Sequence, residues 1–255
     1  MREPNRLEVS MTAQLMNFAS SNASHVIAAD DAPVAAGRPG MTLTGVDYRT
    51  DVSALQDLVA TNPGLEFGLL YSATPEARRR YPELSWLVAT ANALAGRCAI
   101  HVCGRLARAL LIAGELEELV APAARVQVNG DVTPEELPLL ARRVQTLITQ
   151  FNPRVHDLSQ EGGVSNHQLL VDASGGRGIS PSAWHRPNTG KVVGFAGGLG
   201  PHNLEAEASR LAMVARTGWW LDMEESLRTD DWFDVGRCRG VLAAWSALPY
   251  SSTAP

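Results

Sequence analysis

Polar side chains follow several short apolar runs of this sequence, at the point where each run ends. Residues two positions apart on an extended strand share a face. The pairs with this spacing are Thr42/Thr44, His101/Cys103, Gln127/Asn129, Gln150/Asn152 and Asp222/Glu224. Asp172 ends another run, and Glu66 lies early in one more. Burying so many polar groups is costly unless they line a wet pocket, so we interpret them as one site capable of acid–base chemistry.

Two glycines, Gly197 and Gly198, precede a helix expected to begin near Pro201. Glycine allows the backbone N–H groups to approach a ligand closely, and a helix N-terminus attracts anions. A tight turn between strand and helix explains the same glycines without any ligand. Both interpretations are consistent with the residues alone.

Lysine occurs once in the chain, at Lys191. Schiff-base chemistry or a phosphate-loop lysine would therefore have to use this residue. Lys191 opens a predicted strand, at the opposite end from the polar residues. The sequence therefore argues against a lysine-based aldolase.

The composition indicates a folded protein, because 45% of the 255 residues are hydrophobic and 19% are charged. A net charge of -5 argues against a dedicated nucleic-acid binder. No apolar run reaches the roughly 18 residues of a membrane span. The three cysteines form no CxxC pair, which argues against a secreted disulfide scaffold. We expect a cytoplasmic protein that acts on a small molecule, without nucleic acid, membrane, metal or cofactor, and the sequence leaves its oligomeric state open.

From Met41 the chain alternates short apolar runs with segments of helical periodicity. The runs that fit buried strands are Met41–Asp47, Leu65–Tyr71, Cys98–Cys103, Arg125–Asn129, Leu147–Asn152, Gln168–Ala173, Lys191–Ala196 and Trp219–Met223. Helical periodicity is clearest in Val52–Ala60, Ser85–Ala95, Leu106–Leu119, Pro134–Gln145 and Leu204–Ala215. Eight strand-plus-helix units in about 210 residues favour a (β/α)8 TIM barrel over a doubly wound open sheet of five or six strands.

Residues 1–40 differ from the rest of the chain and are rich in Ala, Ser, Asn, Asp and Pro. They lack the basic start and continuous apolar stretch of a secretory signal. We interpret residues 1–40 as an N-terminal extension and residues 41–250 as the barrel domain. Chemistry in such a barrel occurs at the C-terminal ends of the strands, where the polar pairs fall.

Three late segments carry the most specific pattern. They read HQLLVDASGGRGISPSAW (His167–Trp184), KVVGFAGGLGPHNL (Lys191–Leu204) and WWLDMEESLR (Trp219–Arg228). Together they resemble the last three strand–loop units of phosphoribosylanthranilate isomerase, a (β/α)8 enzyme family. Weaker similarity extends to Leu43–Val46 and to the segment that ends in Arg80-Tyr81.

The resemblance implies an Amadori rearrangement, in which an N-linked aldose becomes an amino-ketose. It implies that Asp172 is the general acid on strand six and that Arg80 contacts an aromatic acid at one end of the substrate. Arg78 and Arg79 beside Arg80 also fit a solvated basic run. Combined with the strand-end amides, the expected substrate-binding residues are Arg80, Asn129, Asn152, Gly175, Gly176, Gly197, Gly198 and Asp222.

One position departs from the family. Thr44 stands where the family has the cysteine that acts as general base, and a threonine hydroxyl is too weak a base at neutral pH without an activating partner. The other candidates for the base are Asp47, His101, Cys103 and Glu224, of which His101 needs the least tuning near pH 7. We therefore expect an isomerase-like enzyme that is not phosphoribosylanthranilate isomerase itself.

Two other classes remain open. A lyase, cyclase or metal-dependent enzyme on the same scaffold could use Glu66, His101, Asp222 and Glu224 as metal ligands, although no close-spaced ligand motif supports a metal. A barrel that binds a ligand without turnover would also explain the missing cysteine.

The loop after strand eight is the sharpest difference from the family, which has a small neutral loop there that binds the substrate phosphate. Here Asp222 is followed by Met223, Glu224, Glu225 and Ser226. Two carboxylates about 5 Å from a phosphate would repel it by a few kcal/mol at an effective dielectric near 20. A helix N-terminus offers only about 0.3–1 kcal/mol in return.

We therefore predict a substrate without phosphate at this position. In this interpretation Glu224 faces the pocket, where it binds hydroxyl or amine groups or acts as the base. The alternative is that both glutamates point to solvent. Arg177 or Arg228 would offset part of the repulsion by folding inward.

Overall fold

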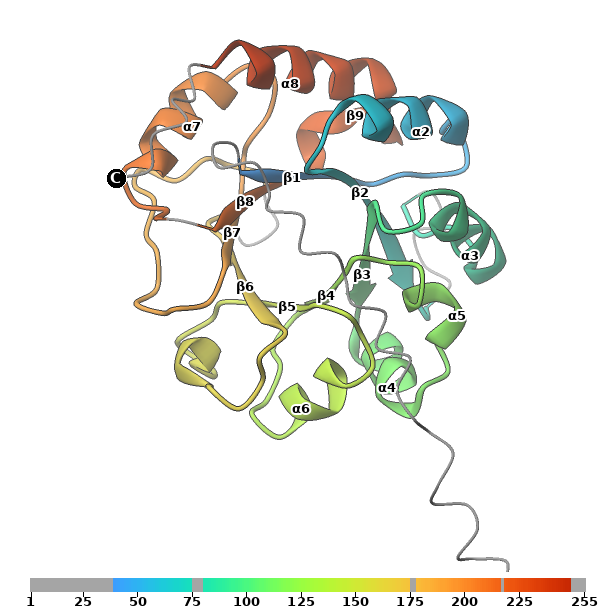
Figure 1. Cartoon of the computed structure of the whole chain (residues 1–255), viewed down its shortest axis with the longest axis vertical. Coiled ribbons are helices and arrows are strands. Elements are labelled where there is room, and N and C mark those ends of the chain that lie inside the picture. Colours follow the sequence, from blue (N-terminus) through green and yellow to red (C-terminus); the bar gives the residue numbers. More distant parts are fainter. Residues whose placement is uncertain (1–38, 75–79, 175–177, 217, 249–255) are drawn as a thin grey trace, which may run out of the picture. The chain divides into compact units, whose positions relative to one another are not determined.

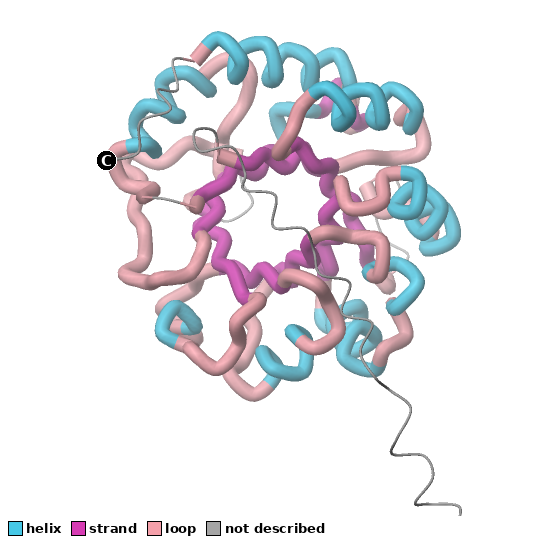
Figure 2. Tube along the Cα trace, in the orientation of Figure 1, coloured by secondary structure: helices cyan, strands magenta, loops and turns pink. Residues whose placement is uncertain are grey.

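The computed structural model describes residues 39–74, 80–174, 178–216 and 218–248. Eight parallel strands close into a barrel in sequence order, with β8 pairing with β1. Helices surround this ring of strands (Figures 1 and 2). The predicted (β/α)8 barrel is confirmed. Residues 1–38 of the predicted N-terminal extension lie outside the described residues.

The strand bounds follow the apolar runs closely. The strands are β1 (Gly40–Thr44), β2 (Leu65–Ser72), β3 (Cys98–Cys103), β4 (Arg125–Asn129), β5 (Leu147–Gln150), β6 (His167–Asp172), β7 (Val193–Ala196) and β8 (Trp219–Met223). The prediction ran too long at four ends, because β1 stops at Thr44, β5 at Gln150 and β6 at Asp172, and β7 begins only at Val193, two residues after Lys191.

The helices are α2 (Val52–Thr61), α3 (Leu84–Ala93), α4 (Arg105–Ala113), α5 (Glu117–Val120), α6 (Glu136–Ala141), α7 (Leu204–Ala212) and α8 (Val235–Ala247). Asp51 caps α2 by accepting a hydrogen bond from the Ser53 backbone N–H at 3.0 Å. The single helix predicted over Leu106–Leu119 is wrong, because Gly114 adopts a left-handed conformation with φ of 89° and ends α4.

Two connections differ from the expected strand–helix alternation. The β5–β6 connection contains only a short 3-10 helix, η1 (Leu158–Gln160), and the described part of the β6–β7 connection forms no helix. The β8–α8 connection adds a second 3-10 helix, η2 (Glu225–Leu227), and a ribbon of two short strands, β9 (Arg228–Thr229) and β10 (Trp232–Phe233).

Most apolar side chains pack between the barrel and its helices, in one large buried cluster. Inside the barrel the apolar cluster is small and consists of Ile148, Leu170 and Trp220 with Val192 and Ala196 against it. Polar side chains, among them Glu66, His101 and Gln127, fill much of the remaining interior.

An ion pair fills the N-terminal side of the barrel interior. Arg125 donates to Glu66 at 2.8 Å and to Thr42 at 2.7 Å, and its guanidinium lies 4.0 Å from the centroid of the Trp220 ring. Because the charges are paired, hydrogen-bonded and stacked on an aromatic face, their burial is tolerated. Glu66 thus supports the floor of the barrel instead of joining the polar residues at the strand ends.

Gly194 on β7 gives a stability prediction, because a Cβ at this position would overlap the Trp220 ring. The ring also stacks with the Arg125 guanidinium, 4.0 Å from its centroid, and has little room to move. We expect Gly194→Ala to lower the free energy of unfolding by roughly 3 kcal/mol. Urea denaturation measures this, with Gly190→Ala as the control, since nothing lies within 4 Å of a Cβ there. Similar losses in both variants would contradict the packing argument.

Candidate active site

A cavity of about 350 Å³ lies at the C-terminal ends of the barrel strands. The predicted site residues that line it are His101, Asn129, Asp172, Gly197, Gly198, Asp222 and Glu224. Thr44 does not line the cavity; it is fully buried and forms a hydrogen bond with Asp222. Gly175, Gly176 and Arg177 lie outside the described residues. The barrel therefore brings together side chains that are more than 120 residues apart in the chain.

Asp172 lies at the C-terminal end of β6. Its Oδ1 accepts hydrogen bonds from the backbone N–H and the hydroxyl of Ser174, at 3.0 and 2.9 Å. The strand register pairs Asp172 with Ala196 and Ala196 with Asp222. Two interstrand spacings of about 4.8 Å therefore separate the backbones of the two aspartates, which leaves room for a small substrate between their side chains.

Asp222 on β8 is 7% exposed, and its Oδ1 accepts a hydrogen bond of 2.6 Å from the Thr44 hydroxyl. Burial raises the pKa of Asp222 to about 7, while the bond from Thr44 and the charge of Arg125 act in the opposite direction. Thr44 therefore holds Asp222 in place as a hydrogen-bond donor. Sequence reasoning missed this contact, although β1 and β8 must be neighbours in a closed barrel.

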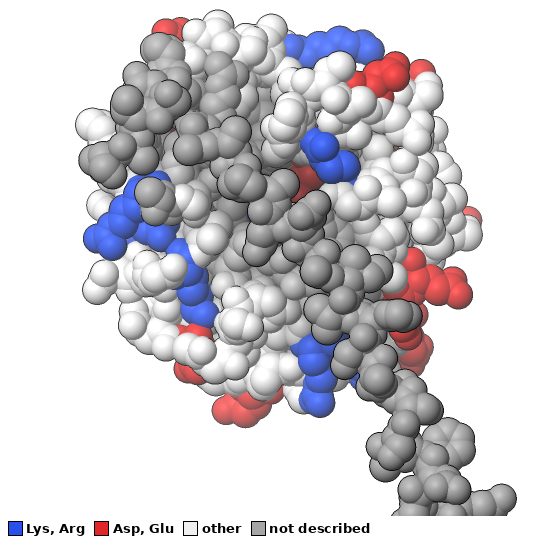
Figure 3. Space-filling model, viewed as in Figure 1, with Lys and Arg blue, Asp and Glu red and all other residues white. Residues whose placement is uncertain are grey.

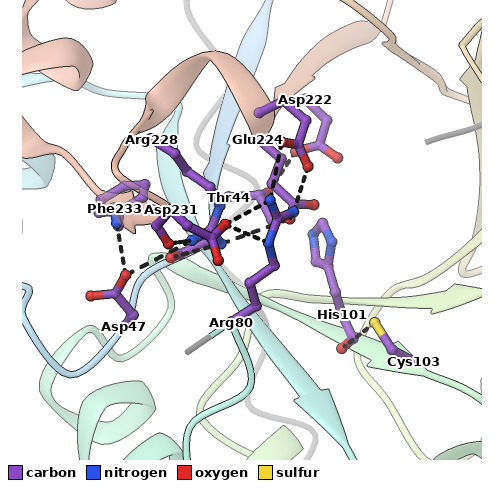
Figure 4. Close-up of polar contacts among 12 residues, drawn as sticks. Thr44, Asp47, Arg80, His101, Cys103, Asp222, Glu224, Arg228, Asp231 and Phe233 are labelled. Atoms are coloured by element: carbon purple, nitrogen blue, oxygen red, sulfur yellow. Dashed lines mark hydrogen bonds and ion pairs between the residues drawn. The ribbon is translucent and has the colours of Figure 1, made fainter. Parts of the chain in front are cut away.

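Glu224 lines the same cavity and keeps 32% of its side chain exposed. Its Oε1 lies 3.4 Å from Nη1 of Arg80 and 3.8 Å from Nη2 of Arg228 (Figure 4). Burial of the carboxyl raises the pKa of Glu224 to about 7, against the influence of Arg228. A carboxyl group with a pKa near 7 is suited to accept a proton at neutral pH.

Arg80 sits at the rim, where acidic side chains of the β8–α8 connection surround it. Its guanidinium donates to both oxygens of Glu225 and, at 2.9 Å, to Asp231. The hydrogen bonds from Arg80 lower the pKa of Glu225. The arginine expected to meet an acidic substrate is thus engaged by the protein's own carboxylates.

Arg228 folds inward and is 4% exposed. It donates to the backbone oxygens of Asp231 and Gly45 at 2.9 and 3.3 Å, and it lies 3.9 Å from the Asp47 carboxylate. Asp47 in turn accepts a bond of 2.7 Å from the Phe233 N–H. Asp47 does not line the cavity, and these contacts tie the β1–α2 and β8–α8 connections together.

His101 is 2% exposed, and its Nδ1 lies 3.3 Å from the Gln127 side-chain nitrogen. Burial lowers the pKa of His101 to about 4, so the ring is neutral at physiological pH and a weak base. Cys103 accepts a bond of 3.2 Å from Asn129, and burial raises its pKa to about 11, so it remains a thiol. Glu224 and Asp222 are better matched than either residue to accept a proton near pH 7.

Asn152 lies apart from the cavity. The chain turns after β5 ends at Gln150, and the Asn152 side chain donates to Asp131 at 3.0 Å. Gln150, the other member of the predicted pair, does line the cavity. Ser174, His202 and Ser226 also line it, and the sequence analysis gave none of these three a role in the site. The short Asp-x-Ser spacing of Asp172 and Ser174 was a signal for the bonds that orient Asp172.

The Gly197–Gly198 loop packs directly against the connection after β6. A Cβ at Gly198 would overlap the backbone of Ile179 and Ser180. Asn203 accepts a bond of 2.9 Å from the Gly200 N–H and donates to the Gly198 oxygen at 2.8 Å. Close approach of two loops therefore explains Gly198 without a bound anion.

Among residues 39–74, 80–174, 178–216 and 218–248, no three His, Cys, Asp or Glu side chains are grouped as a metal site would require. Within the same ranges, no helix is long and apolar enough to cross a bilayer. On the face shown in Figure 3, acidic and basic side chains alternate around the outer edge of the described surface.

The closed parallel barrel, with polar side chains gathered at its C-terminal end, defines a (β/α)8 barrel of the kind that carries active sites at that end. The same fold is found in solved structures. The chain is similar to phosphoribosylanthranilate isomerase from Thermus thermophilus, with a TM-score of 0.58 and 20% identity over 82% of this chain and 98% of that chain.

The chain is also similar to a phosphoribosylanthranilate isomerase in complex with reduced 1-(o-carboxyphenylamino)-1-deoxyribulose 5-phosphate. Here the TM-score is 0.60, with 15% identity over 83% of this chain and all of that chain. The enzyme from Thermotoga maritima gives a TM-score of 0.57 at 15% identity, with 83% and 100% coverage. No protein-family profile and no curated protein sequence matches the chain. The resemblance expected from the late motifs is thus confirmed for the fold.

Proposed function

We propose that this barrel catalyses an acid–base isomerisation of a small polar substrate such as an amino sugar. Asp172 acts as the general acid, and a carboxylate of the Asp222/Glu224 pair acts as the general base. The observation that carries the proposal is the placement of these carboxyl groups around one cavity, with burial raising the pKa of Asp222 and of Glu224 to about 7.

An aldose-to-ketose rearrangement moves protons at several atoms. A proton reaches the ring oxygen as the C1–O bond breaks, a proton leaves C2 to give the enolamine, and C1 then gains a proton as the 2-hydroxyl loses its own and becomes the ketone. Asp172 on β6, Asp222 on β8 and Glu224 just after β8 line the same cavity, and the strand register aligns Asp172 with Asp222. Of Asp222 and Glu224, Glu224 is the more accessible and is our choice for the base.

The site also differs from what a phosphoribosylanthranilate isomerase requires. Thr44 replaces the family's basic cysteine and is hydrogen-bonded to Asp222. Arg80 is paired with Glu225 and Asp231. We therefore propose a related reaction on a different substrate.

One experiment tests the reaction class directly. N-ribosyl and N-glucosyl amines are incubated with the protein in D₂O, and NMR follows deuterium at C1 of the ketose product. Wild-type protein should form product with deuterium at C1, and Glu224→Gln should reduce the rate by about 10²–10⁴-fold. Asp57→Asn, at an exposed position on α2, is the matched control and should not change the rate. Equal rates in Glu224→Gln and wild type would overturn its assignment as the base.

Complementation tests whether the substrate differs from that of phosphoribosylanthranilate isomerase. A tryptophan auxotroph that lacks phosphoribosylanthranilate isomerase should not grow when it expresses this protein. Growth that disappears in Asp172→Asn would show that the chain retains the family's own reaction.

A further inference from the structure

Arg228 is a buried cation close to the carboxyl group that we assign as the base. It follows η2 in the β8–α8 connection, and its side chain is 4% exposed. Its Nη2 lies 3.8 Å from Oε1 of Glu224 (Figure 4). Arg228 does not line the cavity, so it can influence a bound substrate only through a neighbour that does, such as Glu224.

The Arg228 guanidinium is held by backbone oxygens of two connections. Nη1 donates to the Asp231 oxygen at 2.9 Å, and Nη2 donates to the Gly45 oxygen at 3.3 Å. Gly45 also provides the space, because a Cβ at this position would lie 2.6 Å from Nη2. Its φ of 115° belongs to the left-handed region that favours glycine. The surrounding backbone therefore sets the position of the guanidinium.

Asp47 adds a charged anchor. Its side chain is fully buried, and its Oδ2 lies 3.9 Å from Nη1 of Arg228. Backbone N–H groups of Phe233 and Arg49 donate to this carboxylate at 2.7 and 3.0 Å, so it is fixed independently of Arg228. Asp47, Arg228 and Glu224 thus form a chain of alternating charges with Arg228 in the middle.

Arg80 also approaches Glu224, at 3.4 Å, but it is 29% exposed and is shared with Glu225 and Asp231. Water screens the charge of a partly exposed side chain, so such an ion pair contributes little. A buried charge acts through a lower effective dielectric constant and interacts more strongly at the same distance. Arg228 is therefore the stronger electrostatic partner of Glu224.

The ionisable groups around Glu224 agree with this ranking. They are Arg80, Tyr81, Cys103, Asp222, Glu225 and Arg228. Burial raises the pKa of Glu224 to about 7, and Arg228 is the largest opposing influence. Arg80 acts in the same direction as Arg228, whereas Asp222 and Glu225 act in the direction of burial. Burial also raises the pKa of Tyr81 to about 12 and of Cys103 to about 11, so both are neutral at physiological pH.

We propose that Arg228 is a positioning residue for the base. Anchored by Asp47 and by two backbone oxygens, it holds the Glu224 carboxylate at the wall of the cavity and supplies its buried counter-charge. This inference rests on the proposed function, which assigns a proton transfer to Glu224. Without Arg228 the carboxyl group would be protonated more often at neutral pH, and a protonated carboxyl group cannot act as a base.

Carbon-13 NMR of glutamate side chains tests the inference without any substrate. The protein is labelled at glutamate Cδ, and the Glu224 resonance is identified by its absence in Glu224→Gln. We expect Arg228→Gln to move the titration of Glu224 upward by about one pH unit. Arg228→Lys keeps the charge and should titrate within about half a unit of wild type. Arg239→Gln, at an exposed arginine on α8, is the matched control and should leave the titration unchanged.

A second variant guards against loss of the fold. Removing Arg228 alone leaves the buried Asp47 carboxylate without its counter-charge, which lowers the free energy of unfolding. The double variant Asp47→Asn/Arg228→Gln removes both charges. Glu224 should titrate about one pH unit above wild type in this protein too.

The pH dependence of turnover gives a further readout that a purely structural role would not move. A base is active when it is deprotonated, so kcat/KM rises with pH through the pKa of Glu224. An upward shift of one unit moves this rise to higher pH and lowers kcat/KM at pH 7 about fivefold through ionisation alone.

An unchanged Glu224 titration in Arg228→Gln and in the double variant would overturn the inference, whether or not the protein is active. An equal shift in Arg239→Gln would overturn it as well. A shifted titration without deuterium incorporation from any amine substrate would contradict the proposed function alone.

Discussion

Asp172→Asn is expected to reduce the rate of turnover by about 10²–10⁴-fold, while the melting temperature stays within a few degrees of wild type. The amide cannot donate the proton that a carboxylic acid delivers to the ring oxygen. It can still accept the two bonds from Ser174 that orient the Asp172 side chain, at 3.0 and 2.9 Å. Fold and cavity should therefore remain intact.

The measurement pairs two readouts on the same protein. NMR in D₂O gives the rate of product formation, and differential scanning calorimetry gives the melting temperature. Asp57→Asn, an equal chemical change on an exposed surface, should alter neither. A parallel fall of activity and stability in Asp172→Asn would mark Asp172 as a structural residue.

The second prediction concerns stability, and it needs no substrate. Burial raises the pKa of Asp222 from its ordinary value of 3.8 to about 7. Between these values the unfolded chain has released this proton and the native state has kept it. The contribution of Asp222 to the free energy of unfolding is therefore greatest below about pH 4. It falls by about 4 kcal/mol as the pH rises to about 7.

Other buried groups titrate in the same interval, so the comparison must be a difference between two proteins. Burial lowers the pKa of His101 and of His167 to about 4, which makes stability rise with pH over this range. Subtracting the wild-type unfolding free energy from that of Asp222→Asn, measured in urea between pH 4.5 and 7.5, cancels the contributions of the two histidines. Removing the Asp222 charge also lowers the pKa of Glu224, which adds to the same gain of stability in the variant. The variant should gain stability relative to wild type as pH rises.

Thr44→Val provides the matched control for this titration. It removes the hydrogen bond that lowers the pKa of Asp222, so the pH-dependent loss should extend to higher pH. Thr44→Ser keeps a hydroxyl donor and should behave as wild type. A pH-independent difference between wild type and Asp222→Asn would show that burial does not perturb this carboxyl group.

Much of the fold could be predicted because its signals are local. A buried parallel strand reads as a short apolar run, and the eight runs at regular spacing are too many for the usual doubly wound sheet. The position of Asp172 followed from the same pattern, because a polar residue that ends a buried strand lies at the active face of a barrel. The helix predicted over Leu106–Leu119 was wrong because a single glycine, Gly114, interrupts an otherwise continuous apolar periodicity.

The electrostatic state of the site could not be predicted, because it depends on contacts between distant segments. Thr44 meets Asp222 across 178 residues of chain, and Arg80 meets Glu225 across 145. Periodicity identifies which side chains face inward, but proton affinity depends on burial and on which charges surround a group after the barrel closes. The sequence by itself therefore determined the barrel and the strand ends that carry its polar residues. Only the tertiary structure decided that His101 is a buried neutral ring, that Thr44 is a hydrogen-bond donor, and that burial raises the pKa of Asp222 and of Glu224 to about 7.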